Sequence, residues 1–249
     1  MPAIASVSFG KDSLAMLLYI IENHFPLDEV IFYDTGMEFK SIYRNRDKII
    51  EILKHKNIAF KELKPQNSFL YDMIERPVTS KTKGSHYGYG WCGGRCRWGT
   101  TWKIQSLDKY AANATVHYIG IAADEPARIK RLSSPKIAPL ANIGMTEIKA
   151  LQYCRDRGWN WHEETTATKT GYIDLYDILD RVSCWCCGNK NRRELKNIYQ
   201  YLPQYWKQLE FIQDKIERPM KNFSNQKYGE YGNVHRMAEV FHEELYRYK

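Results

Sequence analysis

Six consecutive residues near the start of the chain, Ser8-Phe9-Gly10-Lys11-Asp12-Ser13, combine the groups that bind a phosphate. Gly10 lets the backbone approach an anion, Lys11 supplies a positive charge, and the two serines supply hydroxyl donors. Asp12 is suited to capping a helix or to holding Mg2+. The spacing differs from that of a Walker A loop. We therefore predict a phosphate-binding loop with Lys11 and Asp12 as catalytic candidates; an ordinary capped strand-to-helix turn is the alternative.

Four of the six cysteines form two close pairs, Cys92 with Cys96 and Cys184 with Cys187. A turn between the members of such a pair directs both sulfurs toward one metal ion or cluster. Zn2+ and a [4Fe–4S] cluster both accept four thiolates, so the residues alone leave these two groups open. Cys186 lies inside the second pair and is predicted to be either a substitute ligand or a reactive, catalytic thiol.

The candidate residues lie on an alternation of strands and helices. Short segments rich in apolar and β-branched residues predict strands at residues 3–8, 29–33, 58–63 and 115–121. Apolar residues at helical spacing follow the first two strands. Strands that alternate with helices pair in parallel through right-handed crossovers, so we predict a doubly wound α/β sheet. In such sheets ligands bind beyond the carboxyl ends of the strands, where residues 8–13 would lie.

We expect residues 1–190 to form a nucleotide-binding domain and residues 191–249 a helical C-terminal extension. The extension is predicted to break at Pro203 and to end in a polar, Tyr-rich tail after Pro219. A further helix is predicted from its N-cap Thr146 to Gly158, with Cys154 buried in the core.

An insert at residues 76–103 is too long and irregular for a simple connection, so we expect it to be functional or disordered. It contains six glycines, five Tyr or Trp residues and six Lys or Arg residues. Aromatic rings interleaved with cations suit binding to a nucleic-acid strand. The alternative is that the rings pack around the cysteines.

The net charge of +8 predicts an anionic partner, either a nucleotide or a nucleic acid. No apolar run approaches the length of a membrane-spanning helix, and the first residues lack the basic segment of a signal peptide. We therefore expect a cytoplasmic protein without a membrane partner, in which reduced thiols favour metal binding over disulfides. The sequence makes no prediction of oligomeric state.

Several segments, in order along the chain, resemble the phosphoadenosine phosphosulfate reductase-like family of the PP-loop nucleotide α-hydrolase superfamily. Residues 8–13 resemble its SGGKDS loop, with Phe9 in place of the second small residue. Asp34-Thr35-Gly36-Met37-Glu38-Phe39 resembles its DTG-x-x-F element. Gly120-Ile-Ala-Ala-Asp124-Glu125-Pro-Ala-Arg128 resembles its GIRADES-x-R segment without the first arginine. The remaining matches are Pro139-Leu140, Thr146-Glu147 and Arg181-Val-Ser-Cys184-Trp-Cys-Cys187.

The resemblance implies a HUP-like sheet that binds ATP, or a related adenine nucleotide, with Mg2+. It places the phosphates at residues 8–13 and the adenosine near Asp34 and Thr35, with Gly120 and Arg128 at the same site. Many members adenylate their substrates. Cluster-bearing sulfonucleotide reductases and DNA phosphorothioation sulfurtransferases have similar cysteine patterns, which favours a [4Fe–4S] cluster, with Zn2+ as the alternative.

The leading functional hypothesis is an ATP-dependent sulfurtransferase that modifies a nucleic acid, tRNA or DNA, with a sulfur-donor protein as a partner. A sulfonucleotide reductase is the first alternative. Reductases of the resembling family carry a nucleophilic cysteine in a segment near the C-terminus. This chain has no cysteine after Cys187. A nucleotide-binding sensor without catalysis is the second alternative, because Phe9 and the missing arginine depart from the family pattern.

Overall fold

The computed structural model describes residues 1–81, 84–221 and 232–247. These residues form two compact units. Unit 1 comprises Met1–Asp34, Glu38–Lys64 and Trp102–Trp161, and unit 2 comprises Thr35–Met37, Pro65–Thr101 and the residues after Trp161. The predicted domain boundary at residue 190 stays a prediction.

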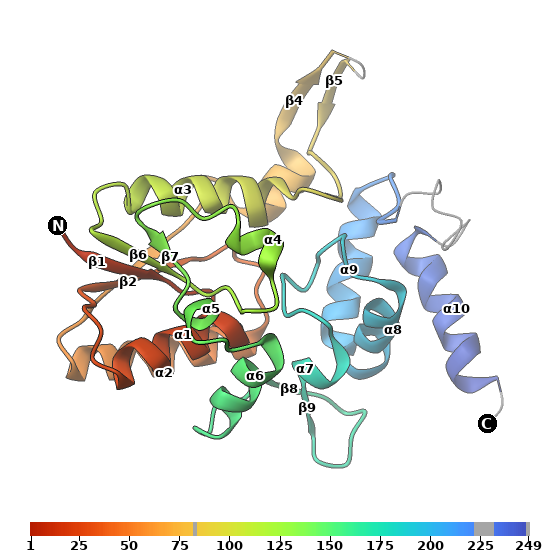
Figure 1. Cartoon of the computed structure of the whole chain (residues 1–249). Coiled ribbons are helices and arrows are strands. Elements are labelled where there is room, and N and C mark those ends of the chain that lie inside the picture. The colour runs from red at the N-terminus through yellow and green to blue at the C-terminus, as the bar shows by residue number, and fades with distance from the viewer. Residues whose placement is uncertain (82–83, 222–231, 248–249) are drawn as a thin grey trace. The chain divides into compact units, whose positions relative to one another are not determined.

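Unit 1 is built on a parallel sheet of five strands in the order β3-β2-β1-β6-β7. The strands are β1 (Ala3–Ser6), β2 (Glu29–Tyr33), β3 (Ala59–Leu63), β6 (Val116–Ile119) and β7 (Lys136–Ile137). The helices are α1 (Lys11–Glu22), α2 (Lys40–His55), α3 (Lys103–Tyr110), α4 (Pro126–Ile129), α5 (Pro139–Asn142) and α6 (Glu147–Arg155). Figure 1 shows α3 on one face of the sheet and α1 and α2 on the other. The prediction of a doubly wound α/β fold is confirmed.

The central strand β1 explains why the sheet is covered on both faces. Ala5 is fully buried and lies opposite Val30 on one side and Tyr118 on the other. A strand that is buried on both faces carries apolar residues without alternation, as the segment Ala-Ile-Ala does here. Helix α1 then buries the apolar face that contains Leu14, and it packs against α5 and α6.

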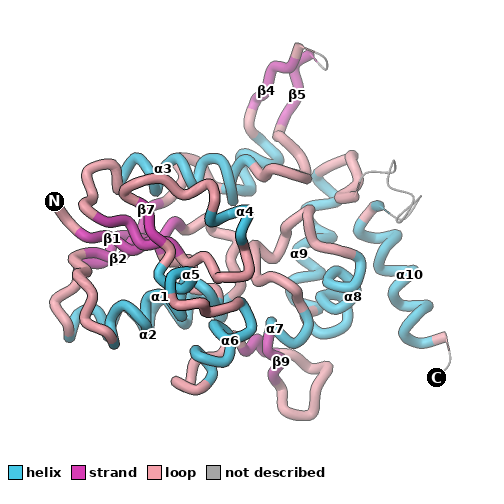
Figure 2. The backbone as a smooth tube through the Cα atoms, in the orientation of Figure 1, coloured by secondary structure: helices cyan, strands magenta, loops and turns pink. Residues whose placement is uncertain are grey.

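Unit 2 contains two antiparallel hairpins and several helices. The hairpins are β4 (Pro77–Ser80) with β5 (Gly84–Tyr87), and β8 (His162–Glu164) with β9 (Tyr172–Asp174). Two π-helical segments span Tyr71–Glu75 and Arg97–Trp102, and the α-helices are α7 (Leu175–Ile178), α8 (Arg192–Tyr201), α9 (Pro203–Lys215) and α10 (Val234–Tyr246). Figure 2 shows the β4–β5 hairpin within the insert, so the described part of residues 76–103 is ordered.

The C-terminal helices pack through aromatic rings. Tyr199 of α8, Trp206 of α9 and Phe241 of α10 meet with ring centroids 5.3–6.0 Å apart. The predicted break at Pro203 is confirmed, because α8 ends at Tyr201 and α9 begins at the proline. The predicted polar tail is wrong where α10 forms, since its apolar face is buried; residues 222–231 of that tail lie outside the described residues. None of the described helices combines the length and apolar character that crossing a bilayer requires.

Candidate functional site

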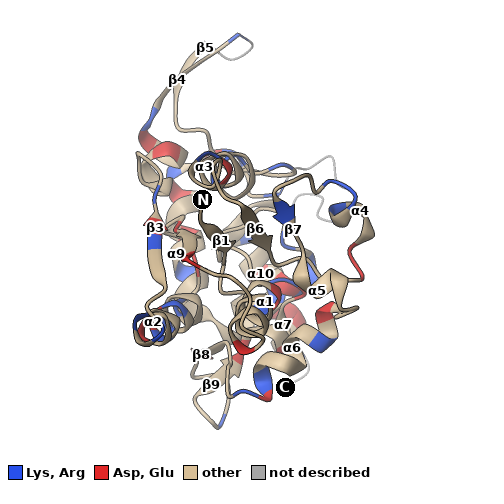
Figure 3. Cartoon of the chain, turned by 60° about the vertical axis from the view of Figure 1, so that its left-hand side comes forward, with Lys and Arg blue, Asp and Glu red and all other residues tan. Residues whose placement is uncertain are grey.

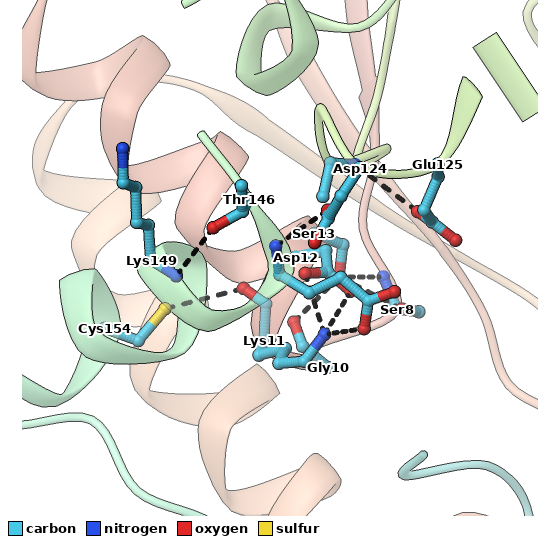
Figure 4. A network of polar contacts seen from close by, with 12 residues as sticks. Ser8, Gly10, Lys11, Asp12, Ser13, Asp124, Glu125, Thr146, Lys149 and Cys154 are labelled. Atoms are coloured by element: carbon cyan, nitrogen blue, oxygen red, sulfur yellow. Dashed lines mark hydrogen bonds and ion pairs between the residues drawn. The ribbon is translucent and has the colours of Figure 1, made fainter. Parts of the chain in front are cut away.

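The predicted phosphate loop connects the end of β1 to the start of α1, and its serines hold it together (Figure 4). The Ser13 hydroxyl lies 3.0 Å from the Ser8 hydroxyl, accepts the Ser8 amide at 3.1 Å and donates to the Gly10 carbonyl at 3.1 Å. The loop therefore lies at the carboxyl end of a parallel strand and at a helix N-terminus, where backbone N–H groups favour an anion.

Phe9 occupies a backbone conformation that favours glycine. Its φ is +60°, in the left-handed region that non-glycine residues rarely adopt. The ring is fully buried and meets Phe32 edge to face at 5.1 Å between centroids. The Trp161 indole donates to the Phe9 carbonyl at 2.8 Å. Burial of the ring offsets the backbone cost, which explains how this chain tolerates Phe where the resembling loops have a small residue.

Gly120 brings the second nucleotide motif against the loop. A Cβ at this position would lie 2.5 Å from the Ser13 Cα and 2.8 Å from the Ser13 nitrogen. Any side chain would therefore collide with the first turn of α1. Glycine is required at position 120 because only glycine lets the chain after β6 approach this turn. Contact of Gly120 with a nucleotide stays a prediction.

Lys11 is buried and paired with two carboxylates within unit 1. Its ammonium lies 2.6 Å from the Glu147 carboxylate and 3.0 Å from that of Asp12. Burial raises the pKa of Asp12, Lys11 lowers it, and the neighbouring Glu147 and Glu125 raise it. Glu147 was not among the predicted site residues. The Thr146-Glu147 pair, which matches the family pattern, is the sequence feature that could have indicated it.

Two other predicted nucleotide residues also have polar partners. Asp34 is buried and accepts a hydrogen bond of 2.7 Å from the Tyr43 hydroxyl, and burial together with Asp34 raises the pKa of Tyr43. Arg128 donates to both carboxylate oxygens of Glu125 at 2.7 Å. In this structure the predicted phosphate ligand Arg128 thus contacts a carboxylate.

The two cysteine pairs lie on loops that are docked against each other within unit 2. The Asn189 side chain accepts the Gly94 amide and donates to the Gly94 carbonyl, both at 2.7 Å. A Cβ at Gly188 would lie 2.4 Å from the Cys92 carbonyl oxygen, so the loops touch backbone to backbone. The tertiary structure therefore brings both predicted pairs into one region.

The sulfurs of the first pair accept backbone hydrogen bonds. The Arg97 amide lies 3.4 Å from the Cys92 sulfur, and the Gly99 amide lies 3.3 Å from the Cys96 sulfur. A hydrogen bond from the Cys96 thiol lowers the pKa of Cys92 to about 6, and the same bond raises the pKa of Cys96. Four thiols, two of which accept backbone amides, suit Zn2+ or a cluster chemically. Within the described residues, however, no three His, Cys, Asp or Glu side chains are gathered as ligands of one metal ion, so the metal site stays a prediction.

The remaining cysteines are buried. Cys186 is 3% exposed, and desolvation, followed by the neighbouring Cys184 and Cys187, raises its pKa well above the ordinary value. Burial and a raised pKa lower the fraction of nucleophilic thiolate, and the reactive role of Cys186 stays a prediction. Cys154 is fully buried, as predicted, and burial raises its pKa to about 12.

The aromatic residues of the insert divide into buried and exposed groups. Trp91 and Trp98 are buried, and the Trp98 indole donates to the Asp72 carboxylate at 3.3 Å. Tyr87 on β5 is 77% exposed. The tryptophans therefore fit the packing alternative, whereas Tyr87 is accessible to a partner. Figure 3 shows Lys and Arg on several elements, α2, α4 and β7 among them, interspersed with Asp and Glu.

The comparison with known families identifies the domain that carries the nucleotide motifs. Residues 2–162 match the model of the phosphoadenosine phosphosulfate reductase domain. The chain belongs to this family. The phosphoadenosine phosphosulfate reductase domain contains the three nucleotide motifs and the first cysteine pair, and it ends before Cys184. Membership supports a PP-loop nucleotide-binding enzyme.

One curated relative extends over a longer part of the chain. It is an uncharacterized protein of Methanocaldococcus jannaschii, 24% identical over 216 residues. The aligned region covers 85% of this chain and 41% of that protein, so the chain spans less than half the length of this relative.

Proposed function

We propose that this chain is an ATP-dependent sulfurtransferase that adenylates an acceptor and then replaces the adenylated oxygen with sulfur. ATP, or a related adenine nucleotide, would bind at residues 8–13 with Mg2+ near Asp12. Asp34 and Thr35 would contact the adenosine side, with Gly120 shaping the loop and Arg128 available to the phosphates after leaving Glu125. The proposed acceptor is a nucleic acid, tRNA or DNA, and the proposed sulfur source is a donor protein.

The observation that carries this proposal is the contact between Thr35 and Cys184. Their oxygen and sulfur atoms lie 3.5 Å apart within unit 2. Thr35 follows Asp34 in the motif after β2, so this nucleotide motif also contacts a thiol of the second cysteine pair. Transfer of sulfur to an adenylated acceptor needs thiol chemistry close to a nucleotide element, whereas nucleotide sensing alone does not.

The chemistry would proceed in two displacements. An oxygen of the acceptor attacks the α-phosphorus of ATP, the bond to the bridging oxygen breaks, and pyrophosphate leaves with that electron pair. Lys11 and the loop amides would stabilise the negative charge that develops on the phosphate oxygens. A hydrosulfide equivalent from the donor then attacks the adenylated carbon, and AMP leaves with the oxygen. Neither step oxidises or reduces the acceptor.

The proposed metal group would be held by Cys92, Cys96, Cys184 and Cys187. A [4Fe–4S] cluster would supply redox and sulfide chemistry there, and Zn2+ would supply a closed structural centre. The indole nitrogen of Trp91, directly before Cys92, is buried without a hydrogen-bond partner among the described residues. A buried donor of this kind is costly unless a ligand or water accepts its hydrogen. The orphaned donor therefore supports a bound group at this loop.

Pyrophosphate exchange and labelled-sulfur incorporation with tRNA and DNA pools test the proposal. We expect Lys11→Ala and Asp12→Asn to reduce exchange about 100-fold or more. Lys54→Ala is the matched control, because this exposed lysine pairs only at the surface with Glu51. Two results would overturn the assigned reaction. One is release of AMP without incorporation of labelled sulfur into tRNA or DNA, and the other is no pyrophosphate exchange with either the tRNA or the DNA pool. Iron, sulfide and zinc quantitation on anaerobically purified protein decides between the two metal groups.

The family match favours one second candidate, a sulfonucleotide reductase. Within this chain, the thiols available for the attack are the cysteines already described. Release of sulfite from adenosine phosphosulfate in the presence of a thiol reductant would identify this activity.

A further inference from the structure

We propose that Glu147 is a positioning residue that makes the phosphate loop prefer a nucleotide carrying its own divalent cation over the free nucleotide. The inference rests on the proposed nucleotide binding at residues 8–13. Lys11 is the basic residue of this loop, and the charges around it decide which form of the nucleotide is favoured.

Lys11 is paired with two carboxylates. Its ammonium lies 2.6 Å from Glu147 and 3.0 Å from Asp12, and its side chain is 9% exposed. Two carboxylates face one ammonium, so with both carboxylates ionised this group of three side chains carries one excess negative charge. A free polyphosphate that approaches the loop meets this excess charge, whereas a polyphosphate with a bound cation is repelled less.

Glu147 is fixed by its backbone at the start of α6. Its amide donates to the Asp124 carboxylate at 3.0 Å, and the preceding residue, Thr146, caps the helix by accepting the Lys149 amide at 3.4 Å. The backbone of Glu147 is thus held in place, and movement of Lys11 toward a phosphate oxygen weakens its pairing with the Glu147 carboxylate. The cost of that exchange falls when the ligand brings a cation that balances the carboxylates.

A merely structural ion pair between α1 and α6 makes a different prediction. Loss of such a pair would lower the melting temperature and weaken nucleotide binding by the same factor with and without a cation. A positioning role predicts opposite behaviour for free nucleotide, because removal of the Glu147 charge releases Lys11 and lowers the repulsion. The sign of the change in affinity therefore separates the two roles.

The test measures the dissociation constant of ATP for the full chain by calorimetry, in MgCl2 and in EDTA. We expect Glu147→Gln to bind free ATP at least about threefold more tightly than the wild type, with a much smaller change for the magnesium complex. Glu147→Asp, which keeps the charge, should retain the wild-type preference, and Glu51→Gln on the exposed face of α2 is the control. The Glu147 side chain is 30% exposed, so its amide replacement is compatible with folding.

The outcomes are distinguishable. Unchanged or weaker binding of free ATP by Glu147→Gln, while the wild type binds the magnesium complex, overturns this inference and leaves the proposed function intact. Equal shifts in both buffers also overturn it, because they indicate a structural pair. If neither protein binds ATP in either buffer, the proposed function and this inference both fail.

Discussion

The hydroxyl oxygen of Thr35 lies 3.5 Å from the sulfur of Cys184. The same hydroxyl accepts the Met37 amide at 3.3 Å, and the Met37 carbonyl accepts the Trp185 amide at 3.0 Å. Residues 35–37 of the nucleotide motif are thus hydrogen-bonded to the loop that carries the second cysteine pair. A substitution at Thr35 should therefore change the accessibility of Cys184.

Thr35→Val keeps the shape of the side chain and removes its hydroxyl. We expect a loss of about 1 kcal/mol in the free energy of unfolding, because the buried Met37 amide loses its acceptor. We also expect faster alkylation of Cys184 by iodoacetamide, measured by mass spectrometry. Thr35→Ser retains the hydroxyl and should behave like the wild type. Equal alkylation rates in the Val and Ser variants would show that the hydroxyl does not hold the cysteine.

Asn189→Ala removes both hydrogen bonds that join the cysteine-bearing loops. If the four cysteines share one metal group, we expect about a tenfold weaker affinity for that metal in competition with a chelator, as for other residues that orient ligands. Asn142→Ala, at an exposed position of α5, is the control. Unchanged metal retention in Asn189→Ala would mean that the docking of the loops does not assemble the centre.

At Phe9 we expect the usual order of stability of an alanine and a glycine variant to be reversed. At ordinary positions alanine is more stable than glycine by about 0.5–1 kcal/mol. At a φ of +60° alanine is strained and glycine is not, so Phe9→Gly should be at least as stable as Phe9→Ala. Both should fall below the wild type by roughly 3–5 kcal/mol, because the buried ring is lost. Urea unfolding measures these differences, and a more stable alanine variant would argue against the left-handed backbone.

His117 should make the chain less stable as the pH falls. It is 2% exposed on β6, with its ring nitrogen 2.6 Å from the Ser6 hydroxyl, and burial lowers its pKa from the ordinary value of 6.5 to about 4. The unfolded chain therefore binds a proton that the folded chain excludes. Stability is fully present above about pH 6.5 and falls toward pH 4, by up to roughly 3 kcal/mol.

Urea unfolding at pH 7 and at pH 4.5 measures this effect for the wild type and for His117→Gln. The glutamine variant should be less stable at pH 7 and lose less stability between the two pH values. An equal loss in both proteins would assign the acid sensitivity to other groups.

The sequence by itself determined the fold class and the strand-to-helix position of the predicted phosphate loop. Strands such as Glu29–Tyr33 and the apolar spacing on α1 are local patterns, because backbone hydrogen bonding and burial of one face repeat with a fixed period along the chain. Gly120, Thr35 and the four paired cysteines were also selected from short motifs. The sequence could not predict that the insert contains a hairpin, since its charged and aromatic residues follow no such period.

Only the tertiary structure decided which of these residues meet. Glu147 reaches Lys11 across 136 positions of the chain, and Asn189 reaches Gly94 across 95 positions. No local pattern contains such pairs, because they depend on how helices and loops pack after the elements have formed. Packing also decided that Cys186 is buried and that Phe9 takes a glycine-like conformation under its aromatic neighbours. The predicted phosphate loop could be read from the sequence, whereas the pairing of Lys11 with Glu147 depends on the packing of α1 against α6.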